Sequence, residues 1–447
     1  MSSSKMETED CKSILENFLL QTLEVNLIRL QWQDYAGVIR AISKPRAIVM
    51  DQILSGQPFE AGEAALSHGY DGSVLPPTPN RHYYHMYPDF SSLRLTPDSK
   101  TAVLMCELKH VEPGYLLDEN DELCPRRALL AAVKALDKKF DYSCTVTFEV
   151  EFLVMRKEGK FHRAFESLRL GESTTSSLRD PLFEHVEECI AHLQSQGVSI
   201  LEVRGGGRKG QFQMLLFPLR PVQAVDQLVF VHETLKTVFA SHGYVVCMLS
   251  NPFGNSLDAG EESDFVHPCL NVHLSRSQKN RDKEDKFFAG IFKRLPSICA
   301  FCLPHRLSYR KQDESDDELT FWQMRPRLIP IRWLESWEIP CVDGTANMYL
   351  ALTAILKAGY LGLLNSEPSV GPEYDPQDNK KLAKDEQLPQ CLNDALRALQ
   401  KTKNLSIDGF RSSMIDHYIQ IKRHEMYRDA VYDDIDKEEE VRIVNFS

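Results

Sequence analysis

The stretch VRGGGRKGQFQML, residues 203–215, places four glycines and the pair Arg208 and Lys209 directly before an apolar run. A phosphate-binding P-loop ends in Gly-Lys-Ser/Thr and opens a helix. Here Lys209 precedes Gly210, no hydroxyl residue follows, and the next segment has the composition of a strand. The sequence therefore excludes a P-loop and favours a hairpin turn that needs positive φ.

The composition is that of a globular protein. The 447 residues are 43% hydrophobic and 26% charged, which suffices for a substantial core. The net charge of −12 comes without a basic stripe, so no nucleic acid partner is expected. No apolar run approaches the roughly 20 residues of a membrane span, and MSSSKMETEDCK has no signal-peptide core. We expect a cytoplasmic protein with no membrane partner.

The cysteines do not indicate a disulfide framework. There are eleven, irregularly spaced along a long chain. Cys299 and Cys302 form one CxxC motif, but no second pair follows at the spacing of a zinc site. Free cysteine packs as a small hydrophobe, so we expect a buried, reduced pair.

The order of patterns divides the chain. Residues 1–12 are polar and predicted to be disordered, and a helix is predicted over 13–24. Alternating β-branched and aromatic residues then predict a small sheet to about residue 108, with a turn at 34–37. Prolines, glycine and acids at 110–125 indicate a boundary. Strands and helices alternate beyond it, and the C-terminal third is predicted to be helical.

The segment FEVEF, residues 148–152, concentrates charge on a strand. Glu149 and Glu151 lie on one face, and three large apolar side chains lie on the other. Two neighbouring carboxylates are costly unless they are solvated or share a cation. A solvent-facing strand and a site for a hard divalent cation both remain open.

Two further segments carry polar pairs. In NVHLSRS, Asn271 and His273 share a strand face, which alone is more often a surface pair than a site. In MRPRLIPIR, Arg325, Arg327 and Arg332 offer forked guanidinium groups for carboxylate or phosphate. The alternative is a basic loop that balances the acidic run 313–318.

Taken in order, these pieces resemble glutamine synthetase from about residue 25 to the C-terminus. FEVEF resembles the paired-glutamate strand, GQFQ the Gly-Gln-x-Glu strand, and NVHLS the His-x-His-x-Ser strand. IRLQWQDYAGVIRA and MYPDFSSLRL resemble the N-terminal β-grasp domain, and FWQMRPRLIPIR resembles the Asn-Arg…Ile-Arg segment. The most specific piece is VDGTANMYLALTAILKAGYLGL, residues 342–363. Within that family, the sequence resembles the divergent fungal members.

The resemblance implies an α+β fold. A disordered N-terminus, 1–12, would precede an N-terminal helix and β-grasp domain, 13–110. A glutamine-synthetase-type catalytic domain, 120–447, would follow, with a curved antiparallel sheet and surrounding helices. The family forms its site between neighbouring subunits, so a homo-oligomeric ring is expected.

Several family site positions are retained. By resemblance, Asp71 in YDGS is the aspartate that helps bind and deprotonate ammonium from the neighbouring subunit. Arg327 is one of two arginines that grip nucleotide and substrate, and is assigned a catalytic role with Asp71. The other retained positions are the metal-binding Glu149, Glu151 and Glu338, and the nucleotide- or substrate-binding His273, Arg310, Lys311 and Arg332, with the Arg-Lys order reversed.

Other family positions are substituted. Gln213 and Gly205 stand where two metal-binding glutamates are expected, and Gly205 is placed by counting eight residues back from Gln213. Asn271 replaces a metal-binding histidine. The glutamate-binding positions are altered at Val266, His267 and Pro340.

The implied function is an ATP-dependent ligase that uses Mg²⁺ or Mn²⁺. It would join a glutamate-type γ-carboxylate to ammonia or an amine, with a weakened first metal position. The alternative, which the substituted metal positions favour, is a catalytically inactive paralogue that binds nucleotide or a partner and acts as a regulator in nitrogen metabolism or development.

Overall fold

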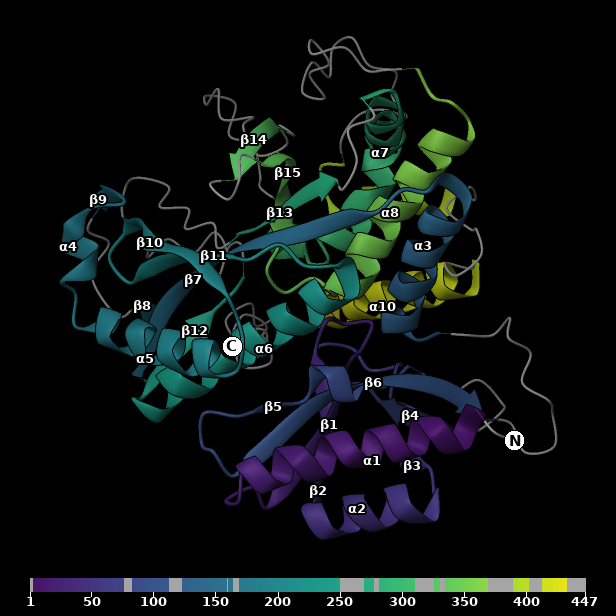
Figure 1. Cartoon of the computed structure of the whole chain (residues 1–447). Coiled ribbons are helices and arrows are strands. Elements are labelled where there is room, and N and C mark those ends of the chain that lie inside the picture. Colours follow the sequence, from purple (N-terminus) through teal and green to yellow (C-terminus); the bar gives the residue numbers. More distant parts are fainter. Residues whose placement is uncertain are drawn as a thin grey trace.

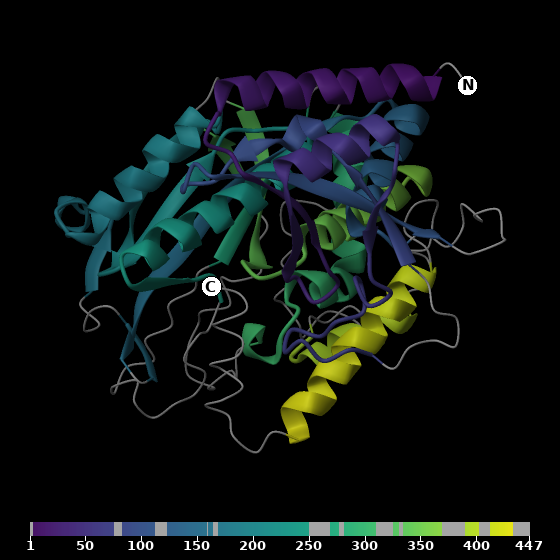
Figure 2. The same cartoon turned by 90° about the horizontal axis from the view of Figure 1, so that it is seen from below.

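The protein is described from a computed structural model, in which a small N-terminal sheet lies against a larger α+β body (Figure 1). Figure 2 shows the same arrangement from below, with the first helix running along the outside of the molecule. The described residues are 3–75, 83–111, 123–158, 160–163, 169–249, 269–276, 281–309, 325–329, 334–368, 389–401 and 412–431.

The small sheet has the strand order β2-β1-β6-β4-β3 in the described residues, with β5 paired to β6. Its centre is a parallel pair, β1 and β6, and every other pairing is antiparallel. The bounds are β1 Leu27–Gln33, β2 Ile39–Pro45, β3 Phe59–Ala61, β4 Tyr83–Pro88, β5 Arg94–Leu95 and β6 Thr101–Val111. The predicted hairpin at 34–37 is confirmed, since β1 and β2 flank it.

Two helices accompany this sheet, α1 Ser3–Gln21 and α2 Arg46–Ser55. The helix α1 begins inside the stretch predicted to be disordered. Met, Glu and Lys are good helix formers, so a polar composition does not by itself prevent a helix there. The prediction of a helix only from residue 13 is therefore wrong at its start.

The large sheet has the order β14-β15-β13-β7-β11-β10-β9 in the described residues, and both β8 and β12 also pair with β7. All these pairings are antiparallel. The bounds are β7 Cys144–Glu158, β8 Lys160–Arg163, β9 Arg169–Glu172, β10 Ile200–Arg208, β11 Gln211–Leu216, β12 Tyr244–Cys247, β13 Cys269–Arg276, β14 Arg325–Ile329 and β15 Leu334–Asp343. The long strand β7 is central, so side chains on it sit at the middle of the sheet.

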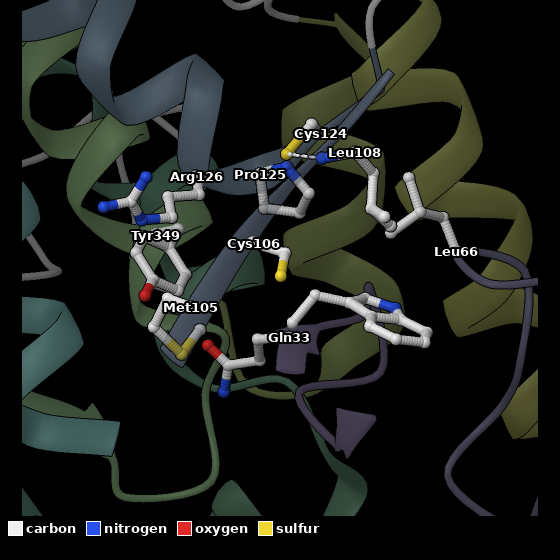
Figure 3. A pocket seen from close by; sticks show the side chains of 10 residues that line it. Gln33, Leu66, Met105, Cys106, Leu108, Cys124, Pro125, Arg126 and Tyr349 are labelled. Atoms are coloured by element: carbon white, nitrogen blue, oxygen red, sulfur yellow. Dashed lines mark hydrogen bonds between the residues drawn. The ribbon is translucent and has the colours of Figure 1, made fainter. Parts of the chain in front are cut away.

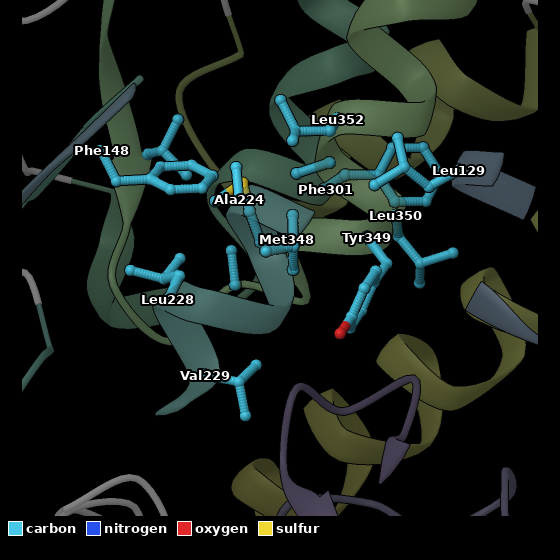
Figure 4. Close-up of a cluster of buried hydrophobic side chains, with 14 of the residues drawn as sticks. Leu129, Phe148, Ala224, Leu228, Val229, Phe301, Met348, Tyr349, Leu350 and Leu352 are labelled. Atoms are coloured by element: carbon cyan, nitrogen blue, oxygen red, sulfur yellow. The ribbon is translucent and has the colours of Figure 1, made fainter. Parts of the chain in front are cut away.

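Helices cover one face of the large sheet and form the core with it. Phe148 on β7 lies among Ala224, Leu228 and Met348 from two helices (Figure 4). The helices of the larger body are α3 Pro125–Phe140, α4 Thr175–Leu178, α5 Leu182–Ser195, α6 Pro221–Ser241, α7 Arg281–Cys302, α8 Met348–Leu364, α9 Leu392–Lys401 and α10 Ser412–Val431. This arrangement confirms the predicted α+β class with a curved sheet and surrounding helices.

The helices α7 and α8 pack closely because glycines face each other. A Cβ added at Gly290 would lie 2.4 Å from the backbone oxygen of Ala358. The apolar helix α8 is buried along nearly its whole length. Its N-terminus is capped by Asn347, whose side chain accepts a 3.1 Å hydrogen bond from the backbone N–H of Leu350. The most specific segment of the sequence thus forms the central core helix.

A buried ion cluster joins the small sheet to the large body. Arg126 at the start of α3 bonds Asp226 of α6 at 2.8 Å and Glu107 of β6 at 3.1 Å, and also pairs with Asp89. A small pocket opens beside Arg126 and Tyr349 (Figure 3). Because its charged member is already paired with three carboxylates, we interpret the pocket as part of this joint.

None of the described helices combines the length and apolar character needed to span a membrane. Cys299 and Cys302 are buried free thiols at the end of α7, which confirms the expected reduced pair.

Candidate functional site

The candidate site begins on β7 with Glu149 and Glu151. On the opposite face of the strand, Phe148, Val150 and Phe152 are at most 1% exposed. Residues that alternate along a strand point to opposite faces. The predicted division of FEVEF into a carboxylate face and an apolar face is therefore what the structure has.

The neighbouring strand β11 brings amides to these carboxylates. The ladder pairs Gln213 with Glu151. The side-chain amide of Gln213 donates to Oε2 of Glu151 at 3.1 Å, and that of Gln211 donates to Oε1. Burial, with the nearby charges of Glu149 and Glu172, raises the pKa of Glu151 to about 8. At neutral pH this carboxyl is therefore mostly protonated.

A basic residue that the sequence did not single out lies beside Glu149. The guanidinium of Arg204, on β10, forms an ion pair with Glu149. It also donates to Oε1 of Gln213 at 2.6 Å and to Oε1 of Glu202 at 2.8 Å. The negative charges of Glu149 and Glu202 raise the pKa of Arg204. Three strands thus converge on one guanidinium.

Exposure distinguishes the two members of this ion pair. The side chain of Glu149 is 5% exposed, whereas that of Arg204 is 27% exposed. A carboxylate buried to this degree requires a cationic or hydrogen-bonding partner. Arg204 is one such partner.

The glycine stretch ends in the hairpin connection between β10 and β11, as the local pattern predicts. Residues 205–208 still belong to β10, where Gly206 and Gly207 pair with β9, and the turn follows at residues 209–210. Gly207 and Gly210 have φ values of 89° and 78°. That left-handed region favours glycine. Gly206 also allows close packing, since a Cβ there would lie 2.7 Å from Cγ of Gln211.

Gly205, which stands where a metal-binding glutamate of the family is expected, lies in this structure on the face of β10 away from Glu151. The ladder pairs Gly205 with Phe212, on the buried face. A Cβ at Gly205 would lie 2.3 Å from Oγ of Ser177. The residue that pairs with Gln213 in this ladder is Arg204, one position before Gly205.

The remaining predicted site residues on the large sheet are placed by backbone register. Asn271 on β13 pairs with Glu149, and His273 pairs with Glu338 on β15. Arg327 on β14 pairs with Ser336. Pro340 lies within β15. The other predicted residues, Arg310, Lys311, Arg332, Val266 and His267, fall outside the described residues.

Asp71 lies in the small N-terminal part and contacts α10. Its carboxylate accepts hydrogen bonds from the backbone N–H of Ser73 at 3.0 Å and from Nε of Arg428 at 3.2 Å. Oγ of Ser73 is also 3.0 Å from Nε2 of His424. Although partial burial opposes it, hydrogen bonding by Ser73 and Arg428 lowers the pKa of Asp71. Asp71 is therefore an ionised, anchored carboxylate.

The side chains around Glu149 and Glu151 do not fit a resident divalent cation. Such an ion prefers charged oxygen ligands. Here Gln213 supplies a neutral amide, Glu151 is held by two amide groups, and Glu149 is paired with Arg204. An ion would have to displace the guanidinium.

Comparison with known proteins explains the arrangement of the sheet. The family model of the glutamine synthetase catalytic domain matches residues 122–437. The chain belongs to the glutamine synthetase family. The resemblance inferred from FEVEF, GQFQ and the core helix is thereby confirmed.

The sequence relatives include fungal and bacterial proteins of the glutamine synthetase family. Protein fluG of Emericella nidulans is 27% identical over 445 residues, which cover 94% of this chain and 49% of that protein. The glutamate–methylamine ligase of Methyloversatilis universalis is 24% identical, with 91% and 93% covered. The chain thus spans about half the length of protein fluG, and 64% of the type-1 glutamine synthetase 1 of Dictyostelium discoideum.

Solved structures show the same fold. The GmaS/ADP complex superposes with a TM-score of 0.76 over 94% of this chain and 97% of the other, at 19% identity. A glutamine synthase homologue gives 0.73 at 20% identity. At these identities the likeness concerns the fold.

Proposed function

We propose that this protein is an ATP-dependent carbon–nitrogen ligase of low turnover. In this reaction ATP phosphorylates the γ-carboxylate of a glutamate-type acid. Ammonia or an amine then attacks the acyl phosphate and phosphate leaves, so that an amide forms. The observation that carries the proposal is the retained pair Glu149 and Glu151 at the centre of the glutamine-synthetase-type sheet.

The relatives support the reaction class and leave the amine open. They include a γ-glutamylpolyamine synthetase, a glutamate–isopropylamine ligase and the glutamate–methylamine ligase. Proteins of this family use ATP with divalent metal ions. We propose that magnesium or manganese reaches this protein with the nucleotide, as part of the substrate complex.

We assign the remaining roles by family position. Asp71 binds and deprotonates ammonium, and the anchored, ionised state of its carboxylate suits a cation. Arg327 stabilises the transferred phosphoryl group through a charge-assisted hydrogen bond. We propose that Glu338, His273, Arg310, Lys311 and Arg332 complete the nucleotide and substrate contacts.

A second candidate function is that of an inactive paralogue which binds nucleotide or a partner and regulates nitrogen metabolism or development. The contact between Arg204 and Glu149 favours it, because a metal-binding carboxylate of the family is engaged by a side chain of the chain itself. The amide at Gln213 points the same way.

Activity on a panel of amines separates the two candidates. Purified protein is given Mg-ATP and glutamate with ammonia, methylamine, isopropylamine or a polyamine, and both phosphate release and the amide product are measured. The ligase proposal expects an amide from at least one amine, lost in Arg327→Ala. If no amine gives product while Mg-ATP still binds by calorimetry, the inactive paralogue is the better description.

We also propose a homo-oligomeric ring in the cytoplasm. The ring follows from the family's shared site. The structure describes eight cysteines as free thiols: six are buried, Cys144 is half-buried and Cys391 is exposed. Reduced thiols suit a reducing compartment, which supports the cytoplasm.

A further inference from the structure

We propose that Arg204 is a built-in cation that takes the place of a divalent metal ion beside Glu149. The inference concerns the same site as the proposed ligase but does not depend on turnover. It depends on where the guanidinium lies and on what surrounds it.

The first argument is geometric. Glu149 of β7, Glu202 of β10 and Gln213 of β11 each place a side-chain oxygen on a different nitrogen of Arg204. A planar guanidinium satisfies several oxygen acceptors at once through its fixed fork. It therefore collects oxygen atoms from neighbouring strands, as a bound cation would.

The second argument concerns charge. The pair Glu149 and Glu202 supplies two negative charges at direct contact with Arg204, while Gln213 is neutral. A divalent ion near this position would meet the positive guanidinium at short range, where like charges repel strongly. The burial of Glu149 makes it costly to leave without a partner, so Arg204 and a metal ion compete for the same carboxylate.

The third argument is that a carboxylate at position 205 could not restore the metal site. The Cβ direction at Gly205 leads to Ser177 on the other face of β10. On the face of Gln213, the residue at that register position is Arg204. Where the resemblance implies an acidic metal site, this protein has a basic environment, and Arg204 is the residue that makes it basic.

The test is manganese binding by chelator-treated full-length protein, without nucleotide or substrate. A surface cluster, His185, Glu188 and His242, has ligand atoms within 4.8 Å of one another and could bind the probe ion. All proteins in the comparison therefore carry His185→Ala and His242→Ala. Bound Mn²⁺ is counted by electron paramagnetic resonance.

We expect Arg204→Met, which preserves length without charge, to bind Mn²⁺ at least about tenfold more tightly than its parent. That gain should disappear in Arg204→Met/Glu149→Gln. Arg204→Lys, which retains the charge, should resemble the parent. Equal Mn²⁺ affinity in the parent and in folded Arg204→Met would overturn the proposal.

A second comparison covers the case in which Arg204→Met does not fold. Here Glu149→Gln is introduced into the parent, without a change at Arg204. Its amide oxygen can still accept a hydrogen bond from Arg204. If Arg204 excludes metal, this substitution leaves Mn²⁺ binding unchanged; if it abolishes binding, Glu149 is a metal ligand and the proposal is wrong. Neither result depends on ligase activity, so the proposed function is tested separately.

Discussion

Arg204 and Gln213 face each other across β10 and β11, and Nε of Arg204 donates a 2.6 Å hydrogen bond to Oε1 of Gln213. The next pair along this ladder, Gly205 and Phe212, belongs to the opposite face of the hairpin. The charge presented to Glu149 is therefore determined by residue 204 and not by residue 205.

This relationship predicts different outcomes for two substitutions that would each add a carboxylate. Gln213→Glu places a charge beside Arg204 and should fold. Gly205→Glu should unfold at lower temperature, because even Gly205→Ala puts a Cβ 2.3 Å from Oγ of Ser177 and overpacking costs about 1–3 kcal/mol. Thermal unfolding measures both.

The matched control is Gly205→Ala with Ser177→Gly, which removes the side chain in the way. It should recover most of the stability lost in Gly205→Ala. A Gly205→Ala protein as stable as wild type would show that the Cβ direction at 205 is wrong.

The two carboxylates of β7 should respond differently to conversion into amides. At pH 7 the unfolded chain carries Glu151 ionised whereas the folded protein holds it protonated, so Glu151→Gln removes this cost and should leave the free energy of unfolding unchanged or raise it. Glu149→Gln removes the charge that pairs with Arg204 and should cost about 1–3 kcal/mol. Urea unfolding of each variant measures the free energy of unfolding.

Glu151 also predicts a pH dependence of stability. Its pKa is raised from 4.5 to about 8, so the folded protein binds the extra proton between these values. The contribution is complete below about pH 4.5 and is lost as pH rises through about 8. Relative to Glu151→Gln, wild type should therefore lose stability across this interval. A difference between the two proteins that stays constant from pH 5 to 8 would contradict the assigned protonation.

The joint between the two sheets gives a prediction with a built-in control. Arg126→Met leaves three carboxylates without their shared cation, and breaking a buried pair in this way costs about 3–5 kcal/mol. Arg127→Met removes a more exposed side chain, 28% accessible and 3.8 Å from Glu107, and should cost about 0–1 kcal/mol. Equal destabilisation of the two variants would mean that Arg126 is not the cation that joins the two sheets.

The sequence predicted local features well because they depend on neighbouring residues. Alternation in FEVEF fixed the faces of Glu149 and Glu151, and the glycines fixed the hairpin. The alternation of side chains along the two strands also indicates that Arg204 lies beside Gln213. A hairpin with a two-residue turn between them puts these two residues on one face. Counting eight residues back from Gln213 led instead to Gly205, on the wrong face.

What the sequence could not supply is the partner of each charge. The contact of Arg204 with Glu149 joins residues 55 positions apart, and that of Asp71 with Arg428 joins residues 357 positions apart. Such contacts arise from tertiary packing, which no local pattern encodes. The division at about residues 110–120 into two domains stays a prediction.

Asp71 carries the prediction about assembly. Its carboxylate is fixed by Ser73 and Arg428, and the proposed role requires it to reach the site of a neighbouring subunit. The protein should therefore have a mass several times the 51.1 kDa of one chain in light scattering at micromolar concentration. Asp71→Asn should keep that mass, because the amide oxygen still accepts from Ser73, while any amide formation from ammonia falls by about tenfold or more. If the protein is monomeric under these conditions, and Asp71→Asn forms the amide at the wild-type rate, Asp71 does not act across subunits.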